Sequence, residues 1–186
     1  ESFSRYGLKF LVTSEWNPVK DEYGAFTAIY GTLVTSFLSL LITIPLGVGT
    51  AIFITEDFVP KVVREIIGSF VELLAAIPSV VLGLWAIFVM EPFFRAFFVF
   101  LHNFFGWIPL FSTEPTGRNS LLAILILVVM LLPIVTSIAR DSLNQVPKKL
   151  RNAAYGIGAS RWKTIFSVIL PAALSGIMAG VLLALG

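Results

Sequence analysis

Long apolar runs alternate with shorter polar segments along the chain. A helix needs about 20 predominantly apolar residues to cross a bilayer, and four runs approach or exceed that length. We predict membrane spans over residues 26–54, 62–90, 120–139 and 164–186. Backbone polar groups must find partners within the chain when they lie in lipid, so such runs form helices. The pattern therefore predicts an all-α, polytopic membrane helical bundle.

Composition supports the membrane assignment. Of the 186 residues, 57% are hydrophobic and only 13% are charged, against a charged share of about 25% in soluble domains. The net charge of +2 is too small to favour nucleic acid as a partner. Without cysteine, the chain has no disulfide framework, thiolate nucleophile or cysteine-bound metal. Because it starts at Glu1 and stops at Gly186 inside an apolar run, we expect an internal piece of a longer polypeptide.

Basic residues set the predicted orientation. The segment 140–163 holds one acid, Asp141, and six basic residues: Arg140, Lys148, Lys149, Arg151, Arg161 and Lys163. Short basic loops between spans stay in the cytoplasm, which predicts that 1–25 and 91–119 are external. The segment 91–119 is rich in phenylalanine, so we expect a short interfacial helix that ends near Gly106.

The cytoplasmic segment 140–163 has helix signals of its own. Pro147 is well placed to begin a short helix, and Gly156 and Gly158 are well placed to end it. We therefore predict a compact helix-turn-helix between the third and fourth spans.

Small and hydroxyl residues recur at every fourth position in two spans. They are Gly31, Thr35, Ser39, Thr43, Gly47, Ala51 and Thr55 in the first, and Ala172, Gly176, Gly180 and Ala184 in the fourth. Such stripes let helix backbones approach each other in lipid, so we interpret them as packing surfaces. The alternative is that the hydroxyls line a path for an oxyanion.

Several residues are candidates for a pathway or gating role. Glu72 lies deep in the second predicted span, and acids inside membranes are functional candidates by default. The other interpretation is a buried Glu72 hydrogen-bonded to the hydroxyls of the first stripe. Each span also carries one proline, which suits kinked helices that rearrange: Pro45, Pro78, Pro133 and Pro171. The candidate pathway or gating set is Glu72, Pro78, Ser79, Pro133 and Arg140.

The cytoplasmic segment resembles a known signature. Asn152, Ala153 and Ala154, followed by Gly158 and then by Leu170-Pro171, resemble the EAA loop of ABC importer permeases. The stretches VELLAAIPSVVLGLW, SIARDSL and NAAYGIGASRW are similar to the phosphate permeases within that class. One departure is Asn152, where the family usually has Glu.

The resemblance implies a MetI-like fold in a multi-pass protein of the bacterial inner membrane. It implies that the loop contacts a cytoplasmic ATPase through eight residues: Asn152, Ala153, Ala154, Tyr155, Gly156, Gly158, Ala159 and Arg161. The implied domain is a transmembrane domain over residues 26–186, preceded by an extracytoplasmic loop, 1–25.

The implied function is that of the permease subunit of an ATP-driven phosphate importer. Its partners would be a second, related permease, two cytoplasmic ATPases and an extracytoplasmic phosphate-binding protein. ATP and Mg would be bound by the ATPase, and we expect no cofactor in this chain. The alternatives are a permease for another solute such as sulfate or molybdate, a channel or scaffold, and a membrane-embedded enzyme. The scatter of Glu72, Arg95 and His102 argues against an enzyme.

Overall fold

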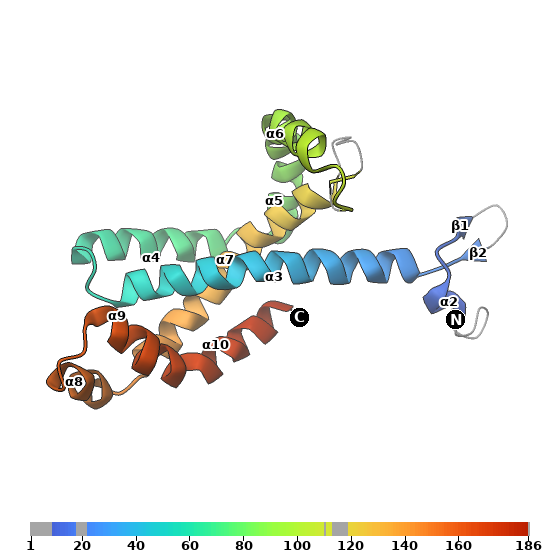
Figure 1. Ribbon diagram of the computed structural model, residues 1–186. Helices are drawn as coiled ribbons and strands as arrows, with labels where there is room; N and C mark the ends of the chain where they lie inside the picture. The colour runs from blue at the N-terminus through green and yellow to red at the C-terminus, as the bar shows by residue number, and fades with distance from the viewer. Residues whose placement is uncertain (1–8, 18–21, 110, 113–118, 186) are drawn as a thin grey trace. The chain divides into compact units, whose positions relative to one another are not determined.

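The computed structural model describes residues 9–17, 22–109, 111–112 and 119–185 (Figure 1). The chain forms two compact units, Glu1–Leu38 and Ser39–Gly186, and their boundary falls inside helix α3, Phe26–Thr55. The described part is almost entirely helical, which confirms the predicted all-α class.

The first unit contains a small structure ahead of α3. A one-turn helix, α2 (Lys9–Val12), is followed by strands β1 (Trp16–Asn17) and β2 (Glu22–Tyr23), which pair antiparallel. The backbone N–H of Ala25 donates to the carbonyl of Phe10 at 2.8 Å, and that of Phe26 to Thr13 at 3.2 Å. These bonds join α2 to the start of α3.

The second unit holds the rest of α3 and the remaining helices. They are α4 (Lys61–Ala75), α5 (Ser79–Trp85), η1 (Ala86–Met90), α6 (Glu91–Phe105), α7 (Ser120–Asn144), α8 (Lys148–Gly156), α9 (Arg161–Thr164), η2 (Ile165–Ile169) and α10 (Leu170–Leu185). The segments η1 and η2 are π-helical and continue into their neighbours without a break. Among the residues that the structure describes, four helices are long and apolar enough to cross a membrane: Phe26–Thr55, Ser79–Phe105, Ser120–Asn144 and Arg161–Leu185.

The second span differs from the prediction. We predicted one span over residues 62–90, but the helix breaks after Ala75 and restarts at Ser79, with Pro78 as the capping residue. Proline has no N–H for the helix ladder and disfavours a helical conformation in the residue before it. The span-length helix is Ser79–Phe105, so it includes α6, which we expected to be a separate interfacial helix. The predicted end at Gly106 is confirmed, since this glycine caps α6.

Two prolines follow the π-helical segments. Pro92 comes two residues after η1, and Pro171 two residues after η2. A wide turn accommodates a residue that cannot donate to the i−4 carbonyl. Pro45 and Pro133 lie within α3 and α7.

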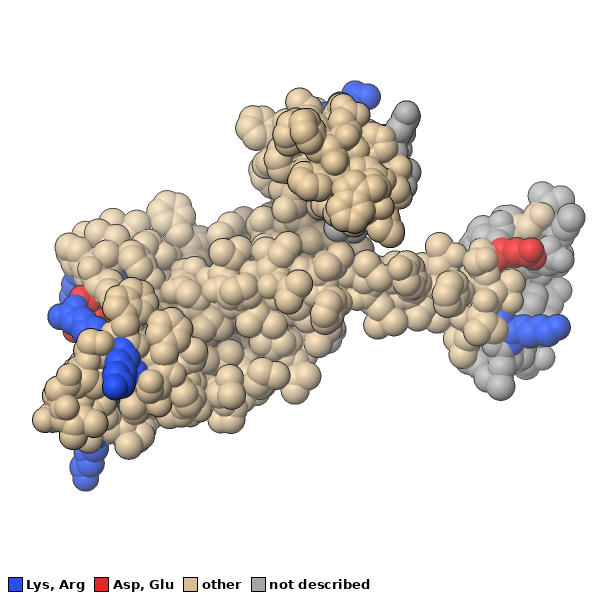
Figure 2. Space-filling model, in the orientation of Figure 1, with Lys and Arg blue, Asp and Glu red and all other residues tan. Residues whose placement is uncertain are grey.

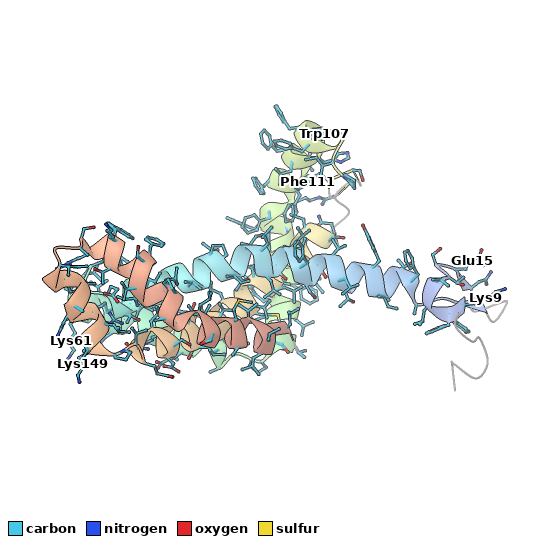
Figure 3. All side chains as sticks on the ribbon, turned by 60° about the horizontal axis from the view of Figure 1, so that its bottom comes forward. Lys9, Glu15, Lys61, Trp107, Phe111 and Lys149 are labelled. Carbon is cyan, nitrogen blue, oxygen red and sulfur yellow. The ribbon has the colours of Figure 1, made fainter. Side chains whose placement is uncertain are left out.

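Two hydrophobic clusters lie at opposite ends of α7. One joins α7 to α3, η2 and α10 through Ala51, Ile52, Ala139, Leu143, Val146, Ile165, Ile169, Ala173 and Ile177. The other joins the start of α7 to η1 and α6 through Ala86, Met90, Phe98 and Leu122. Within the second unit, Figure 3 shows Lys61 and Lys149 at one end and Trp107 and Phe111 at the far end of α6.

Basic residues of the second unit gather over α4, α8 and α9 (Figure 2). Short basic loops are retained in the cytoplasm, so the cytoplasmic location of this end stays a prediction.

Single cysteines test this orientation, since the chain has none of its own. In sealed cells an impermeant thiol reagent is expected to label Ser112→Cys and to leave Ser160→Cys unlabelled until the cells are permeabilised. Both positions are exposed, so access to the side chain within the chain is matched. Labelling of Ser160→Cys in sealed cells would show that the orientation is inverted.

Candidate functional site

The loop between α7 and α10 is built by two helix-end signals. Helix α8 begins after Pro147 and ends at Gly156. The N–H of Ala159 then donates to the carbonyl of Ala154 at 3.1 Å, and the N–H of Gly158 donates to Tyr155 at 2.9 Å. This pair of bonds is a Schellman motif, and it needs a left-handed residue after the cap. Gly158 supplies it with φ +83°.

The chain restarts as a helix two residues later. The Ser160 side chain accepts a hydrogen bond from the N–H of Lys163 at 3.3 Å, as a helix-capping serine does. Helices α9, η2 and α10 then follow as one continuous helix. The structure therefore has the predicted helix-turn-helix, with the predicted residues at its ends.

Most of the predicted coupling residues lie on the surface of this loop. Asn152, Ala153, Tyr155, Gly156, Gly158 and Arg161 are exposed, Ala159 is half-buried and Ala154 is buried. Ala154 packs inside the chain, so it is not free to contact a partner. Ile157 was not in the predicted set, yet its side chain is 87% exposed. This exposed apolar side chain lies next to the predicted coupling residues Gly156 and Gly158.

The loop is fastened to the turn between α3 and α4. Arg151 of α8 forms an ion pair with Glu56, and its Nη2 donates to the carbonyl of Leu143 at 2.8 Å. Arg161 donates to the carbonyl of Asp57 at 2.9 Å. A cavity of about 330 Å³ lies between the turn and the loop, lined by Glu56, Asp57, Phe58, Tyr155, Arg161 and Ile165.

Two of the candidate gating residues are in contact. Arg140 Nη1 of α7 lies 3.3 Å from Glu72 Oε1 of α4. A Cβ on Gly68 would lie 3.4 Å from the same Nη1, so this glycine leaves room for the arginine. Glu72 thus pairs with Arg140, and its side chain is 70% exposed, so it is not the buried residue of the alternative interpretation. Pro133 is buried inside α7, and Pro78 and Ser79 are exposed at the start of α5. The gating role of all five stays a prediction.

The stripe of small residues faces α7 in the second unit. Ser39, Thr43, Gly47 and Ala51 are buried. A Cβ on Gly47 would lie 2.9 Å from Val135 Cγ1 of α7, and one on Gly180 would lie 2.8 Å from Ile138 Cγ2. Gly176 sits against Ser142 in the same way. In the first unit, Gly31 has no neighbour within 4 Å of a Cβ, and the Thr35 hydroxyl donates to the Gly31 carbonyl at 2.8 Å. The buried part of the stripe therefore serves close packing.

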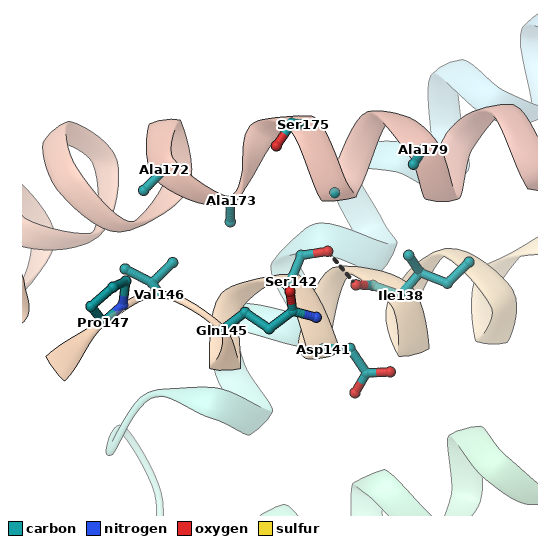
Figure 4. A pocket seen from close by; sticks show the side chains of 11 residues that line it. Ile138, Asp141, Ser142, Gln145, Val146, Pro147, Ala172, Ala173, Ser175 and Ala179 are labelled. Carbon is teal, nitrogen blue, oxygen red and sulfur yellow. Dashed lines mark hydrogen bonds between the residues drawn. The ribbon is translucent and has the colours of Figure 1, made fainter.

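A groove of about 530 Å³ runs between the end of α7 and the start of α10 (Figure 4). Its polar lining comes from Asp141, Ser142, Gln145 and Ser175. The Ser142 hydroxyl donates to the carbonyl of Ile138 at 2.7 Å. Asp141 is the one charged residue of the lining, and a carboxylate repels an anion.

The residues considered for an enzyme lie on two helices, with Arg95 and His102 on α6 and Glu72 on α4. His102 Nδ1, near the end of α6, lies 2.7 Å from the carbonyl oxygen of Phe111. Glu72 of α4 forms an ion pair with Arg140 of α7. Among the described residues, no group of three or more His, Asp or Glu could hold a metal ion.

Comparison with known proteins decides the family. Residues 43–186 match the family described as "Binding-protein-dependent transport system inner membrane component". The chain belongs to this family. It is 42% identical to the phosphate transport system permease protein PstC of Mesorhizobium japonicum and 40% identical to that of Pasteurella multocida, in both cases over all of this chain. It spans 58% and 59% of those relatives' lengths.

A solved structure shares the fold of this family member. It is an inward-facing conformation of the MetNI methionine ABC transporter, with a TM-score of 0.63 and 22% identity over 87% of this chain and 66% of that one. At this identity the likeness shows the MetI-like fold alone. The chain is part of a multi-pass inner-membrane protein, as the family description and the four apolar helices show.

Three residues in the loop or in the turn beside it were not among the predicted site residues. Arg151 was named only as one of the basic residues of the segment 140–163, and Glu56 was given no site role, because no local signal joins positions 95 residues apart. Ile157 could have been found, since an Ile between two glycines at a helix end has no helix face on which to be buried.

Proposed function

We propose that this chain is part of the permease subunit of an ATP-driven phosphate importer. The observation that carries the proposal is the 42% and 40% identity, over the whole chain, to relatives named as phosphate transport system permeases. The exposed helix-turn-helix between two span helices supports it, because it supplies a cytoplasmic surface for an ATPase.

The proposed coupling surface is the exposed side of α8 and the turn after it. Four of its residues are exposed to solvent: Asn152, Ala153, Tyr155 and Gly158. Ile157 adds an exposed apolar side chain as an anchor. Interface energy is concentrated in a few well-buried anchors surrounded by neutral contacts. In this proposal Ile157 and Tyr155 enter a groove of the ATPase, and Asn152 takes the place of the usual Glu without its charge.

The proposed partners follow from the same assignment. They are a second permease of the PstA type, two ATPase subunits of the PstB type and an extracytoplasmic phosphate-binding protein of the PstS type. ATP and Mg are bound by the ATPase, so the permease supplies the path and the binding protein supplies most of the substrate choice.

Uptake measurements test the proposal. Cells that lack the full-length gene are expected to lose high-affinity uptake of radiolabelled phosphate and to regain it with the gene, while sulfate and molybdate uptake stay unchanged. The regained uptake is expected to disappear in cells that also lack the partner ATPase, as it would not for a channel. Restored sulfate uptake without phosphate uptake would assign the permease to another solute.

A further inference from the structure

One side chain of α8 is bonded to the ends of two span helices. Arg151 pairs through Nη1 with Glu56, the residue after the end of α3, and donates through Nη2 to Leu143, the second-last residue of α7. Three helices therefore meet at one guanidinium.

The helix ends explain why a cation is needed at this point. The last carbonyls of a helix carry partial negative charge, which favours a cation and disfavours a carboxylate. Glu56 stands at such an end of α3, and Leu143 O belongs to the last turn of α7. The side chains of Arg151 and Glu56 are only 18% and 12% exposed, so water does little to screen them. Without Arg151 the carboxylate would be left at a negative helix end.

The chemistry of the guanidinium suits two bonds at once. Its planar fork presents several N–H donors in fixed directions, whereas a lysine ammonium is a compact point charge. Arg151 can therefore hold the α3 and α7 ends in one fixed geometry relative to α8.

Other contacts keep the loop in place independently of Arg151. Arg161 donates to the Asp57 carbonyl at 2.9 Å, and the rings of Phe58 and Trp162 pack with centroids 5.0 Å apart. These contacts hold α9 on the turn between α3 and α4. Loss of Arg151 would therefore remove its bonds from α8 to the ends of α3 and α7 without releasing the whole loop.

We propose that Arg151 is a positioning residue that transmits movement of α8 to the ends of α3 and α7. The proposal rests on the proposed function, in which the ATPase binds the exposed side of α8. Arg151 points away from that side, into the chain, so its loss should spare ATPase binding and weaken the transfer of motion to the spans.

Four variants of the full-length protein in the assembled importer test this role. Arg151→Met leaves Glu56 unpaired and is expected to lower the thermal stability of the complex. The double variant Arg151→Met/Glu56→Gln removes both charges, and replacing a whole buried pair is far less costly than removing one partner. The double variant is expected to regain stability and still to transport at least about fivefold less phosphate per ATP hydrolysed than wild type.

The other two variants serve as conservative replacement and control. Arg151→Lys keeps the charge but not the two directed bonds, so an intermediate yield of phosphate per ATP is expected. Lys61→Met removes an exposed charge at the start of α4, outside the proposed coupling surface, and is expected to leave the yield unchanged. A double variant with wild-type yield would show that Arg151 only stabilises the fold, and would overturn the proposal.

A second measurement needs no phosphate. Spin labels at Lys149→Cys on α8 and Phe53→Cys on α3 both occupy exposed positions. In the otherwise wild-type importer the distance between the labels is expected to stay constant when ATP is added, because Arg151 ties the two helices. In the double variant it should shift or broaden with ATP. Suppose that the label distance responds to ATP only in the double variant, but the importer carries no phosphate: this result would contradict the proposed function and leave the role of Arg151 intact. A label distance that ATP leaves unchanged in the double variant would contradict the role of Arg151.

Discussion

Gly158→Val is expected to leave the permease inserted in the membrane and to remove most ATP-driven uptake. Gly158 has φ +83°, a conformation that costs a residue with a β-carbon about 1 kcal/mol or more. No atom lies within 4 Å of a Cβ built there, so the new side chain meets no clash within the chain and projects from the surface that the ATPase is proposed to approach. Each 1.4 kcal/mol of lost ATPase binding lowers affinity about tenfold. Insertion, ATPase co-purification and phosphate uptake, measured side by side, check this.

Two further variants separate the backbone from the side chain. Gly156→Ala lies in the last position of α8 with open space around it, so it is expected to be mild. Asparagine tolerates the left-handed conformation. The Gly158→Asn variant should therefore retain uptake if only the loop geometry matters. Full ATPase binding and full uptake in Gly158→Val would remove this residue from the coupling site.

Gly176→Ala is expected to separate α10 from α7 and to destabilise the bundle. A Cβ on Gly176 would lie 2.9 Å from the Cβ of Ser142 and still nearer to its hydroxyl. The hydroxyl is held by its bond to the Ile138 carbonyl, and the Ser142 Cβ moves only if the helix moves. Overpacking of this kind costs about 1–3 kcal/mol. The loss should appear as a lower melting temperature and a poorer yield of monodisperse protein in detergent.

The neighbouring helix supplies the rescue and a distant glycine the control. Ser142→Gly removes both clashing atoms, so the double variant Gly176→Ala/Ser142→Gly should recover most of the lost stability. Gly49→Ala adds the same methyl group in α3, where nothing lies within 4 Å, and should be neutral. If Gly176→Ala and Gly49→Ala melted at the same temperature, the close contact of α7 and α10 would not matter for stability.

Features set by neighbouring residues could be predicted from the sequence. Pro147 and Gly158 bound α8 because a proline suits the start of a helix and a glycine suits the left-handed turn after it, and both rules involve only a few consecutive residues. The spans over α3 and α7 follow from uninterrupted apolar runs, which need no knowledge of their neighbours.

The second span could not be placed correctly by the same reasoning. Pro45 and Pro133 stay inside their helices, whereas Pro78 ends one and begins another. Sequence alone did not distinguish them, because a membrane proline is tolerated wherever neighbouring groups satisfy the freed carbonyl. Arg64 and Glu72 in α4 were the available hint that this helix has a polar side.

Contacts between distant residues were also out of reach. Glu72 and Arg140 were both selected as candidates, one for its depth and one for its place at a loop, but nothing in the sequence joined them. Their pairing depends on α4 lying against α7, and on Gly68 leaving space for the guanidinium. Arg151 and Glu56 meet for the same kind of reason, through the folding of α8 back onto the ends of α3 and α7.

The π-helical segment η2 sets the angular phase of α10. Five buried residues, Ile165, Ile169, Ala173, Ile177 and Val181, recur at every fourth position through η2 and α10. In a regular α-helix such a series rotates by about 40° at each step, or roughly 160° in all. A wide turn takes more residues per rotation and reduces that drift. If η2 were one residue shorter, every later residue would take its predecessor's place, and Ile177 would stand where Gly176 now admits Ser142.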